Sequence, residues 1–346
     1  MKKEKGLFTE KIKISNNRKK IYILSLTIIL ICVILFAITR GTYKIKVKDI
    51  IGIYKSHFFN TPGKFDDNAV SIVLNVRTPR IFMSALVGAS LSLSGLLFQG
   101  VFRNPLVEPY ILGISSGAAC GAAFAIVFGI LSIEVSSFIF SILAMATAYF
   151  IATKNKSTPL VSLILAGLIV SSIFTSVLNY LKIISSDSKL RELSFWLMGG
   201  FYTSDYSSVL KLLPVFIIGF IVSSALSWKL NILTMGNEEA KSLGVNTEVI
   251  KIILILSATV LCSTSVSQVG IISWVGLMIP HITRLSSGPD HRYLIPITCL
   301  FGASFMIICD TIARTLIMGE IPISIVTSII GSPYLIYLLR SNRKVY

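Results

Sequence analysis

The chain has 346 residues, of which 53% are hydrophobic and 14% are charged, and its formal net charge is +16. Soluble domains carry about 25% charged residues, so this composition excludes an ordinary soluble protein and points to lipid as the solvent. The basic residues are scattered over the polar segments between apolar blocks, which favours membrane flanks over a nucleic-acid surface, and we expect no nucleic-acid partner.

Ten apolar blocks follow one another along the chain. The first, residues 21–39, holds nineteen residues without a charge, close to the roughly 20 that a bilayer span requires. Continuous apolar runs of this length predict helices, since barrel strands would alternate over about ten residues. The other nine blocks are residues 81–99, 111–131, 133–152, 159–181, 209–228, 249–268, 272–287, 293–313 and 321–339.

These blocks predict an all-α, polytopic membrane protein with about ten transmembrane helices in one compact bundle, residues 21–340. Residues 1–20 would form an N-terminal tail and residues 341–346 a C-terminal tail. The tail of residues 1–20 carries eight Lys and Arg residues, which predicts a cytoplasmic N-terminus. Ten spans return the C-terminus to the same side. Residues 40–80, on the opposite side, also carry eight, so the charge difference across the membrane is small.

The polar segment after the first span contains an amphipathic stretch, residues 44–54, which we expect to lie along the membrane surface as a helix. Further along, small residues recur every four positions. Such spacing places them on one helix face, where two helices approach closely. The two runs are Ser84, Gly88 and Ser92, and Gly113, Gly117 and Gly121.

Nothing in the chain predicts a resident metal or cofactor. All five cysteines lie in apolar blocks and none forms a C-x-x-C pair, so we interpret them as buried small hydrophobes. His281 follows Pro280, and we interpret it as a structural, hydrogen-bonding histidine because no partner ligand stands near it in the sequence.

One alternative function is an intramembrane serine hydrolase. Residues 113–117 read Gly-Ile-Ser-Ser-Gly, which satisfies the G-x-S-x-G pattern with Ser115 as the nucleophile. That pattern requires a strand-to-helix turn together with a histidine and an acid. Here it stands at the predicted start of a helix, which argues against the enzyme.

The energy source separates two classes of transporter. No G-x-x-x-x-G-K-[ST] phosphate loop is present, so an ATP-driven transporter needs its ATPase on another polypeptide. An ion-coupled secondary transporter, the alternative, needs carboxylates in the middle of the membrane. The span interiors offer Asp310, with Arg314 four residues later, while Glu134 and Glu320 lie near span ends.

The most informative polar stretch is residues 231–246, between the sixth and seventh spans. Asn237 can cap a short helix whose first turn holds Glu238 and Glu239, where the helix dipole favours anions. Gly244 suits the left-handed position that ends such a helix. We therefore predict a two-turn helix displayed to the cytoplasm.

Three blocks of sequence together resemble the FecCD-type permease family, which includes the membrane subunit of the vitamin B12 importer. The resemblance covers about residues 20–342 in the order of the family. The blocks are Arg77-Thr-Pro-Arg80 through Asn104-Pro-Leu106 to Ala118; Leu165-Ala-Gly167 through Trp196-Leu-Met-Gly-Gly200 to Glu239-Ala-x-x-x-Gly244; and Gly270 through Pro280-His281, Asp290-His-Arg292 and Asp310 to Arg340.

This resemblance implies a subunit of an ATP-binding-cassette importer in the bacterial cytoplasmic membrane. Two permease chains, identical or paralogous, would pair around a central path in the lipid bilayer. Each would bind a cytoplasmic ATPase that holds ATP and Mg²⁺, and a substrate-binding protein would dock outside. Residues 231–246 would then couple the chain to its ATPase, with the contact residues Asn237, Glu238, Glu239, Ala240, Leu243 and Gly244.

The resemblance also assigns an outer docking site and an inner gate. Arg77, Arg80 and Arg314 match arginines that meet acidic residues of the binding protein, although Arg77 and Arg80 could instead anchor a helix at the headgroups. Asn104, Pro105 and Leu106 match a constriction of the path, or form only a helix stop. Ser157 and Thr158 occupy the place of a second constriction. The expected cargo is a metal chelate, with iron–siderophore first and haem or cobalamin as alternatives.

Overall fold

The computed structural model describes residues 2–59, 63, 65–154, 158–317 and 319–340, and the elements of this part of the chain are all helices. The helices are α1 (Lys2–Thr39), α2 (Val47–Phe59), α3 (Asp67–Ser71), the π-helical turn η1 (Ile72–Arg77), α4 (Thr78–Phe102), the 3₁₀ helix η2 (Pro109–Leu112), α5 (Ile114–Phe128), α6 (Ile133–Ala152), α7 (Leu160–Ile184), α8 (Asp187–Met198), α9 (Tyr206–Ala225), α10 (Ser227–Met235), α11 (Asn237–Ser242), α12 (Thr247–Val269), α13 (Val275–Ser287), α14 (His291–Ala313) and α15 (Ile323–Arg340).

Each of the ten predicted apolar blocks coincides with one helix, which confirms the all-helical fold and the approximate helix count. Among the described residues, seven helical segments are long and apolar enough to cross a membrane. The segment 67–102 is a single 36-residue helix, because η1 joins α3 to α4 without a break. α5 and α15 are shorter apolar helices, and α13 has 13 residues with Pro280 inside it. The expected tail is helical from Lys2 and continuous with the first span, as its many Lys and Glu residues allow.

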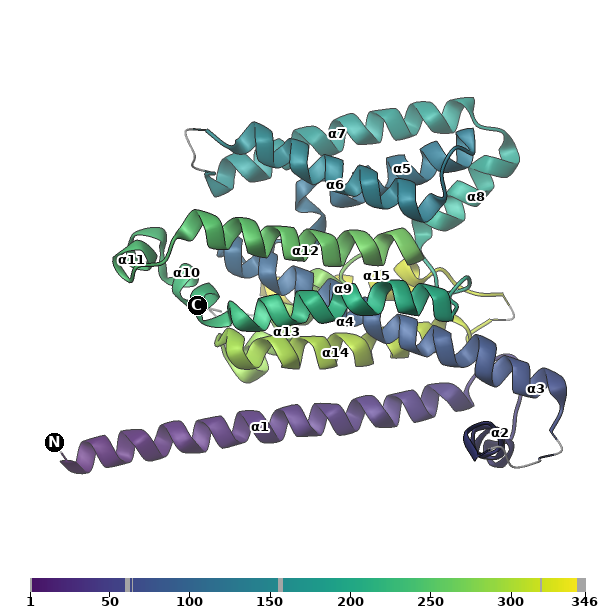
Figure 1. Cartoon of the computed structure of the whole chain (residues 1–346), viewed down its shortest axis with the longest axis horizontal. Helices are drawn as coiled ribbons and strands as arrows, with labels where there is room; N and C mark the ends of the chain where they lie inside the picture. Colours follow the sequence, from purple (N-terminus) through teal and green to yellow (C-terminus); the bar gives the residue numbers. More distant parts are fainter. Residues whose placement is uncertain (1, 60–62, 64, 155–157, 318, 341–346) are drawn as a thin grey trace.

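The centre of the bundle is α4, which packs against α9, α12, α13 and α14. In its most apolar stretch 83% of the residues are buried inside the chain, against 11% in α1. Figure 1 shows α4 running through the middle, with α5, α6, α7 and α8 grouped on one side of it and α1 along the opposite edge. The outer helices therefore keep their apolar faces turned away from the chain, as expected for contact with lipid.

Glycines bring the backbones of neighbouring helices together. A Cβ added to Gly88 of α4 would lie 2.3 Å from the carbonyl oxygen of Gly302 in α14. Cβ atoms on Gly117 and Gly121 would each lie 2.5 Å from a backbone oxygen of α6. The two predicted small-residue runs are thus helix–helix contacts, except that Gly113 lies before α5 and ends η2.

The molecule has two distinct ends. The start of α1 lies at the same end as α10 and α11, and α2, α3 and α8 lie at the other (Figure 1). A helix is present where residues 44–54 were predicted to form one: α2 begins three residues later and ends five residues later. α8 was not predicted because Asp187, Lys189, Arg191 and Glu192 interrupt its apolar pattern.

Candidate functional site

The three arginines expected at the outer docking site lie at the end of the molecule that carries α2 and α8, but they are buried. Arg77 is 3% exposed, and Arg80 and Arg314 are each 6% exposed. Arg77 ends η1, Arg80 lies in the first turn of α4, and Arg314 caps the C-terminus of α14. All three therefore lie at or next to helix ends, and an open docking surface formed by their guanidinium groups is not what the structure shows. Their position on the outer side of the membrane stays a prediction.

Arg80 is the centre of a buried ionic network. Its Nε and Nη2 donate to Oδ1 of Asp310 at 2.9 and 2.7 Å, and its Nη1 donates to Oε1 of Glu320 at 2.6 Å. Asp310 is fully buried, and its Oδ2 lies 3.5 Å from Nε of Arg314. A charge removed from water is tolerated only when it is paired, so these four side chains form one electrostatic unit.

Arg77 and Arg314 hold the end of α1 in place. Nη1 of Arg77 donates to the carbonyl oxygen of Ile38 at 2.8 Å, and Nη2 of Arg314 donates to that of Ala37 at 2.7 Å. Arg77 also donates to the carbonyl oxygen of Tyr43, beyond the helix end. Ile38 lies in the last turn of α1, where carbonyls have no partner within the helix, and the carbonyl oxygen of Ala37 also accepts from the amide of Arg40 at 3.2 Å. The two arginines thus hold the end of α1 through its carbonyls. The alternative considered for Arg77, anchoring at the lipid headgroups, stays a prediction.

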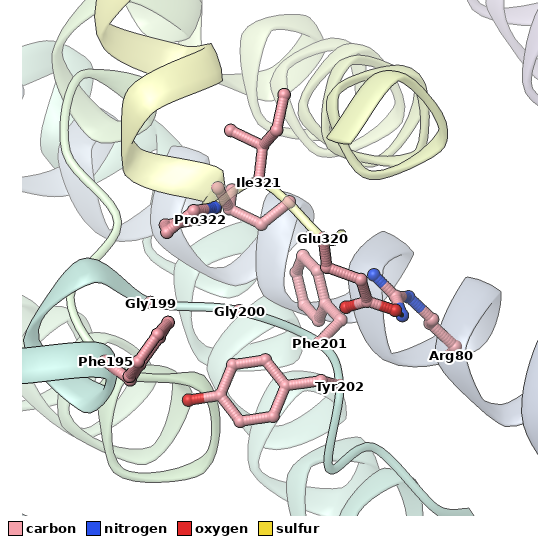
Figure 2. Close-up of a pocket in the computed structure, with 10 residues that line it drawn as sticks. Arg80, Phe195, Gly199, Gly200, Phe201, Tyr202, Glu320, Ile321 and Pro322 are labelled. Carbon is pink, nitrogen blue, oxygen red and sulfur yellow. Dashed lines mark hydrogen bonds and ion pairs between the residues drawn. The ribbon is translucent and has the colours of Figure 1, made fainter. Parts of the chain in front are cut away.

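A pocket of about 300 Å³ opens beside this network. Figure 2 shows the carboxylate of Glu320 turned toward the guanidinium of Arg80, with the rings of Phe201 and Tyr202 nearby and Phe195 further along the wall. The side chain of Glu320 is 44% exposed, whereas that of Arg80 is 7% exposed. Water and a partner protein can therefore reach Glu320 first.

The predicted coupling helix is present at the opposite end as α11. It ends as expected: the amide of Val245 donates to the carbonyl of Ala240 and that of Gly244 to Lys241, at 3.0 and 2.9 Å. This is a Schellman closure, which requires the left-handed backbone that Gly244 adopts at φ +76°. The start differs from the prediction, since Gly236 at φ +147° is the N-cap and Asn237 is the first helical residue.

α11 presents an exposed outer face. Ala240 is fully buried and fixes the helix to the bundle, while Leu243 is 60% exposed. The side chain of Glu238 is 88% exposed and pairs loosely with Lys241 at 3.6 Å, a contact worth little in water. A Cβ added to Gly244 would meet nothing within 4 Å. The helix therefore displays two acids, an apolar residue and an open glycine at the tip of the molecule.

Hydrogen bonds to the loop before α14 hold α10, the helix that leads into α11. Nδ2 of Asn231 donates to Oδ1 of Asp290 at 2.8 Å, and Oδ1 of Asn231 accepts from the amide of His291 at 2.9 Å. Arg292 forms an ion pair with Asp290 at 2.7 Å. Burial by itself would raise the pKa of Asp290, but hydrogen bonds from Arg292 and Asn231 outweigh it and lower the pKa to about 2. Sequence reasoning missed this tie, because Asn231 and Asp290 are 59 residues apart.

The residues expected at the first constriction form a turn at the same end. Arg103 ends α4 in the left-handed conformation, and Oδ1 of Asn104 accepts from the amide of Leu106 at 3.0 Å. Asn104 and Pro105 line a cavity of about 430 Å³ together with Arg284 and His291. Leu106 is 53% exposed. This turn is therefore more than a helix stop, since it forms part of a cavity wall.

Of the second expected constriction, Ser157 lies outside the described residues. Thr158 is buried, and its amide donates to Oε2 of Glu248 at the start of α12 at 3.3 Å. Its hydroxyl is hydrogen-bonded to that of Thr153 at 3.0 Å. Thr158 thus lies against α12, and its role in a gate stays a prediction.

Two further residues were interpreted from the sequence, His281 as a structural histidine and Ser115 as a possible nucleophile. His281 is buried as expected, but neither ring nitrogen has a hydrogen-bond partner among the described residues, and its ring stands edge-on to Tyr334 at 6.2 Å. The hydrogen-bonding role assigned to His281 is therefore not found among the described residues. Ser115 lies in the first turn of α5, which follows a 3₁₀ helix. The strand-to-helix elbow of a serine hydrolase is thus missing at this motif.

The chain is similar in sequence to known proteins. Residues 28–341 match the FecCD transport family. The chain belongs to the FecCD transport family. A cobalamin import permease, BtuC of Halobacterium salinarum, is 40% identical over 80% of this chain and 75% of its own. A molybdate import permease, MolB of Haemophilus influenzae, is 37% identical over 91% of this chain and 95% of its own.

A solved structure in the same family extends the likeness to the fold. It is an ABC transporter described as metal-chelate type, in an inward-facing conformation, and it is 36% identical with a TM-score of 0.82 over 92% of this chain and 98% of its own. This FecCD-family chain is therefore the membrane-spanning permease subunit of an ABC importer. It is a transport component and not an enzyme, and the ATPase of such an importer is a separate chain.

Proposed function

We propose that this chain forms one half of the path by which an ATP-driven importer brings a metal chelate into the cytoplasm. The observation that carries this proposal is α11, a short helix with an exposed outer face at one tip of the bundle. Glu238, Leu243 and Gly244 lie on that face, while Ala240 attaches it to the core. Such a helix suits insertion into a groove of the partner ATPase, which would hold ATP and Mg²⁺.

Movement of α11 reaches the rest of the bundle through its neighbours. α10 leads into α11 and is hydrogen-bonded to the loop before α14 through Asn231 and Asp290. α12 follows α11 after four residues. Closure of two ATPases around ATP would therefore displace α10, α12 and α14 together and alternate a pair of permease chains between outward and inward states.

The proposed orientation places α11 and both termini in the cytoplasm. The start of α1 and α11 lie at the same end of the molecule (Figure 1), and ten spans bring α15 back to that end. Residues 1–20, with their eight basic residues, then flank the cytoplasmic face, where Lys and Arg are favoured. α2, α3 and α8 would face outward.

The buried network argues against an ion-coupled transporter. An ion-coupling carboxylate must exchange its ion with water on each side of the membrane. Asp310 is fully buried and bonded to Arg80, with Arg314 at 3.5 Å. Its charge is already balanced within the chain, which leaves ATP as the better supported energy source.

At the outer end we propose that a substrate-binding protein docks over the pocket beside Arg80. Glu320 is half-exposed and occupies Nη1 of Arg80, so a carboxylate of the partner can reach this guanidinium by replacing Glu320. Direct contact of Arg77 and Arg314 with the partner would require their bonds to the α1 carbonyls to break, and their role in docking stays a prediction.

For the cargo we propose a bulky metal chelate, with an iron–siderophore complex first and cobalamin or haem as alternatives. The relatives include permeases for cobalamin and for molybdate, so family membership leaves the cargo open. Among the described residues, no three His, Cys, Asp or Glu side chains come together as metal ligands. A path without such ligands suits a metal that stays enclosed in its chelator.

The coupling role of α11 is tested by replacing Gly244 with Trp, alone and with Glu239→Lys. The matched control is Gly129→Trp in the loop after α5, because Gly129 also has a positive φ, +68°, and nothing within 4 Å of an added Cβ. The two glycine replacements therefore carry similar backbone strain at opposite ends of the molecule.

The measurement is ATP-dependent uptake into proteoliposomes that contain the importer, supplied in turn with a ferric siderophore, cobalamin and haem. We expect Gly244→Trp to abolish uptake and co-purification of the ATPase, with Gly129→Trp retaining both. Normal uptake in the Glu239→Lys, Gly244→Trp double variant would contradict the coupling assignment. ATP-independent uptake that responds to ionophores would contradict the energy source.

A further inference from the structure

α2 is a firmly held helix that lies across the outer end of α1. Its inner face is formed by Ile50 and Ile53, which are 4% and 2% exposed and pack with Ala69 and Val73. A hydrogen bond joins the hydroxyls of Tyr54 and Thr78. Arg77 bonds the carbonyls on either side of the turn between α1 and α2. The outer face of α2 is therefore presented in a fixed direction.

That outer face carries an apolar stripe. Val47, Ile51 and Phe58 are 54%, 63% and 76% exposed. At about 100° per residue, these three positions fall within about 40° of one another around the helix axis. The stripe lies on the side of α2 turned away from Ala69 and Val73. Phe59, 74% exposed at the end of the helix, falls about 100° around the axis from Phe58.

A row of lysines runs beside the apolar stripe. Lys48 and Lys55 are exposed, and their separation of seven positions places both on one line about a quarter turn from the stripe. Lys44 and Lys46, also exposed, precede the helix. The acid in the first turn, Asp49, is half-buried. The exposed face of α2 is thus apolar along one line and cationic along the next.

The direction of α2 indicates whether this face meets the membrane surface or a protein partner. In Figure 1 α1 runs across the picture while α2 is seen end-on, so the two axes cross at a steep angle. α1 is a membrane span, which places α2 close to the plane of the membrane at the level where the span ends. A helix that lies in this plane, with an apolar side and flanking lysines, matches an interfacial helix.

We propose that the exposed face of α2 binds the membrane surface, with its apolar stripe at the boundary of the acyl chains and its lysines on the phosphates of anionic phospholipids. An apolar stripe gains free energy from burial at this boundary. Each lysine near an anionic surface adds an electrostatic attraction that neutral lipid does not supply. An acidic protein would account for the lysines but would leave the apolar side chains beside them in water.

The depth of α2 in the membrane tests the contact. A nitroxide label is placed at position 51 (Ile51→Cys) in the full chain, in which the exposed Cys32 is replaced by Ser; the other four cysteines are buried. Nanodiscs of phosphatidylglycerol and of phosphatidylcholine are compared. The control label is at Leu243→Cys, because Leu243 is similarly exposed but lies on α11.

In phosphatidylglycerol we expect the label at position 51 to collide mainly with oxygen and the label at position 243 mainly with a water-soluble nickel complex. Nickel collisions that dominate at position 51 in both lipids would overturn the membrane contact and favour a protein partner for α2. This readout does not depend on transport, so it stands apart from the test of the coupling helix.

Charge reversal then tests the lipid class. Lys48→Glu with Lys55→Glu should shift the label at position 51 toward the nickel complex in phosphatidylglycerol and leave it unchanged in phosphatidylcholine. The matched control, Lys229→Glu with Lys241→Glu, makes the same change of net charge at the other end of the molecule and should leave the label in place. Equal depth in both lipids, with no effect of the lysine reversal, would overturn the preference for anionic lipid.

Discussion

Arg80 shows how a membrane helix keeps a charge at its end. The guanidinium is 6% exposed and makes three hydrogen bonds, two to Asp310 from α14 and one to Glu320 from the segment before α15. The two acids differ sharply in exposure, 0% for the side chain of Asp310 and 44% for that of Glu320. The same arginine therefore has one permanent partner and one that solvent can replace.

This difference predicts unequal effects of removing each acid. Asp310→Asn leaves Arg80 and Arg314 buried without their shared charge and should destabilise the protein by about 3–5 kcal/mol. Glu320→Gln should cost less than about 1 kcal/mol, because that pair is partly in water. The measurement is thermal unfolding in detergent, followed by thiol labelling of the four buried cysteines. Equal losses in the two variants would contradict the division into permanent and replaceable partners.

Asp290 predicts a pH dependence at the opposite end. Its pKa is lowered to about 2 in the folded chain, from an ordinary value of about 3.9 in an unfolded one. A lowered pKa stabilises the fold above the unfolded value, and that stabilisation is lost as pH falls through the folded value.

Asp290→Asn should therefore destabilise the protein at neutral pH by at most about 2.6 kcal/mol, and by less than that because solvent screens this partly exposed group. The gap between the variant and the parent should close as pH falls from about 4 to about 2. Denaturant unfolding at a series of pH values measures this gap. A gap that stays constant over the whole range would mean that the carboxylate charge contributes nothing.

At the scale of elements, glycines bring the backbones of α4 and α14 into direct contact. A Cβ on Gly302 would lie 2.2 Å from Oγ of Ser92 and 2.5 Å from the carbonyl oxygen of Gly88. Such spacing leaves no room for any side chain, and small residues at both positions let the two backbones meet. The contact is between backbone atoms, which cannot move aside as a flexible side chain can.

Gly88→Leu should force α4 and α14 apart and destabilise the bundle by at least about 1–3 kcal/mol, the cost of overpacking a core. The comparison is Ala146→Leu, which adds the same kind of side chain at an exposed position of α6 and should change stability by less than about 0.5 kcal/mol. Detergent-phase melting curves compare the two. A tolerated Leu at position 88 would show that the helices separate easily.

Periodicity and propensity predicted most of the elements but few of the contacts between them. The block of residues 133–152 matches α6 residue for residue, because a long apolar run has a single favourable structure in lipid. The sequence did not predict α8, because its charged residues interrupt the apolar pattern of a helix that packs by only one face. The pair of Asp310 and Arg314, four residues apart, was visible in the sequence, but Arg80 is 230 residues from Asp310. Only the fold brings those two together.

The candidate sites followed the same division. The end of α11 was predictable from Gly244 because the left-handed conformation is a local property of the backbone. Its start was misassigned to Asn237, because Gly236 fills the cap with a conformation that few other residues adopt. The outer position of the arginines stays a prediction, and their burial depends on the carbonyls of α1, which could not be seen in their own segment.

At the scale of the whole molecule, α14 links the pocket beside Arg80 to α10, the helix that leads into α11. α14 carries Asp310 close to its outer end, and the loop at its inner end carries Asp290, which is bonded to Asn231 of α10. Its 23 residues span about 35 Å at 1.5 Å per residue. Packing against α4 at Gly302 fixes it along its length.

The close approach of Gly88 and Gly302 therefore makes α4 and α14 a single lever. Two helices in backbone contact cannot slide independently, so a displacement of one end is delivered to the other with little loss. Binding of a partner at Arg80 and a conformational change of the ATPase at α11 would then act on opposite ends of the same helix pair. The close spacing at these two glycines would then determine how much of a displacement at one side of the membrane is transmitted to the other side.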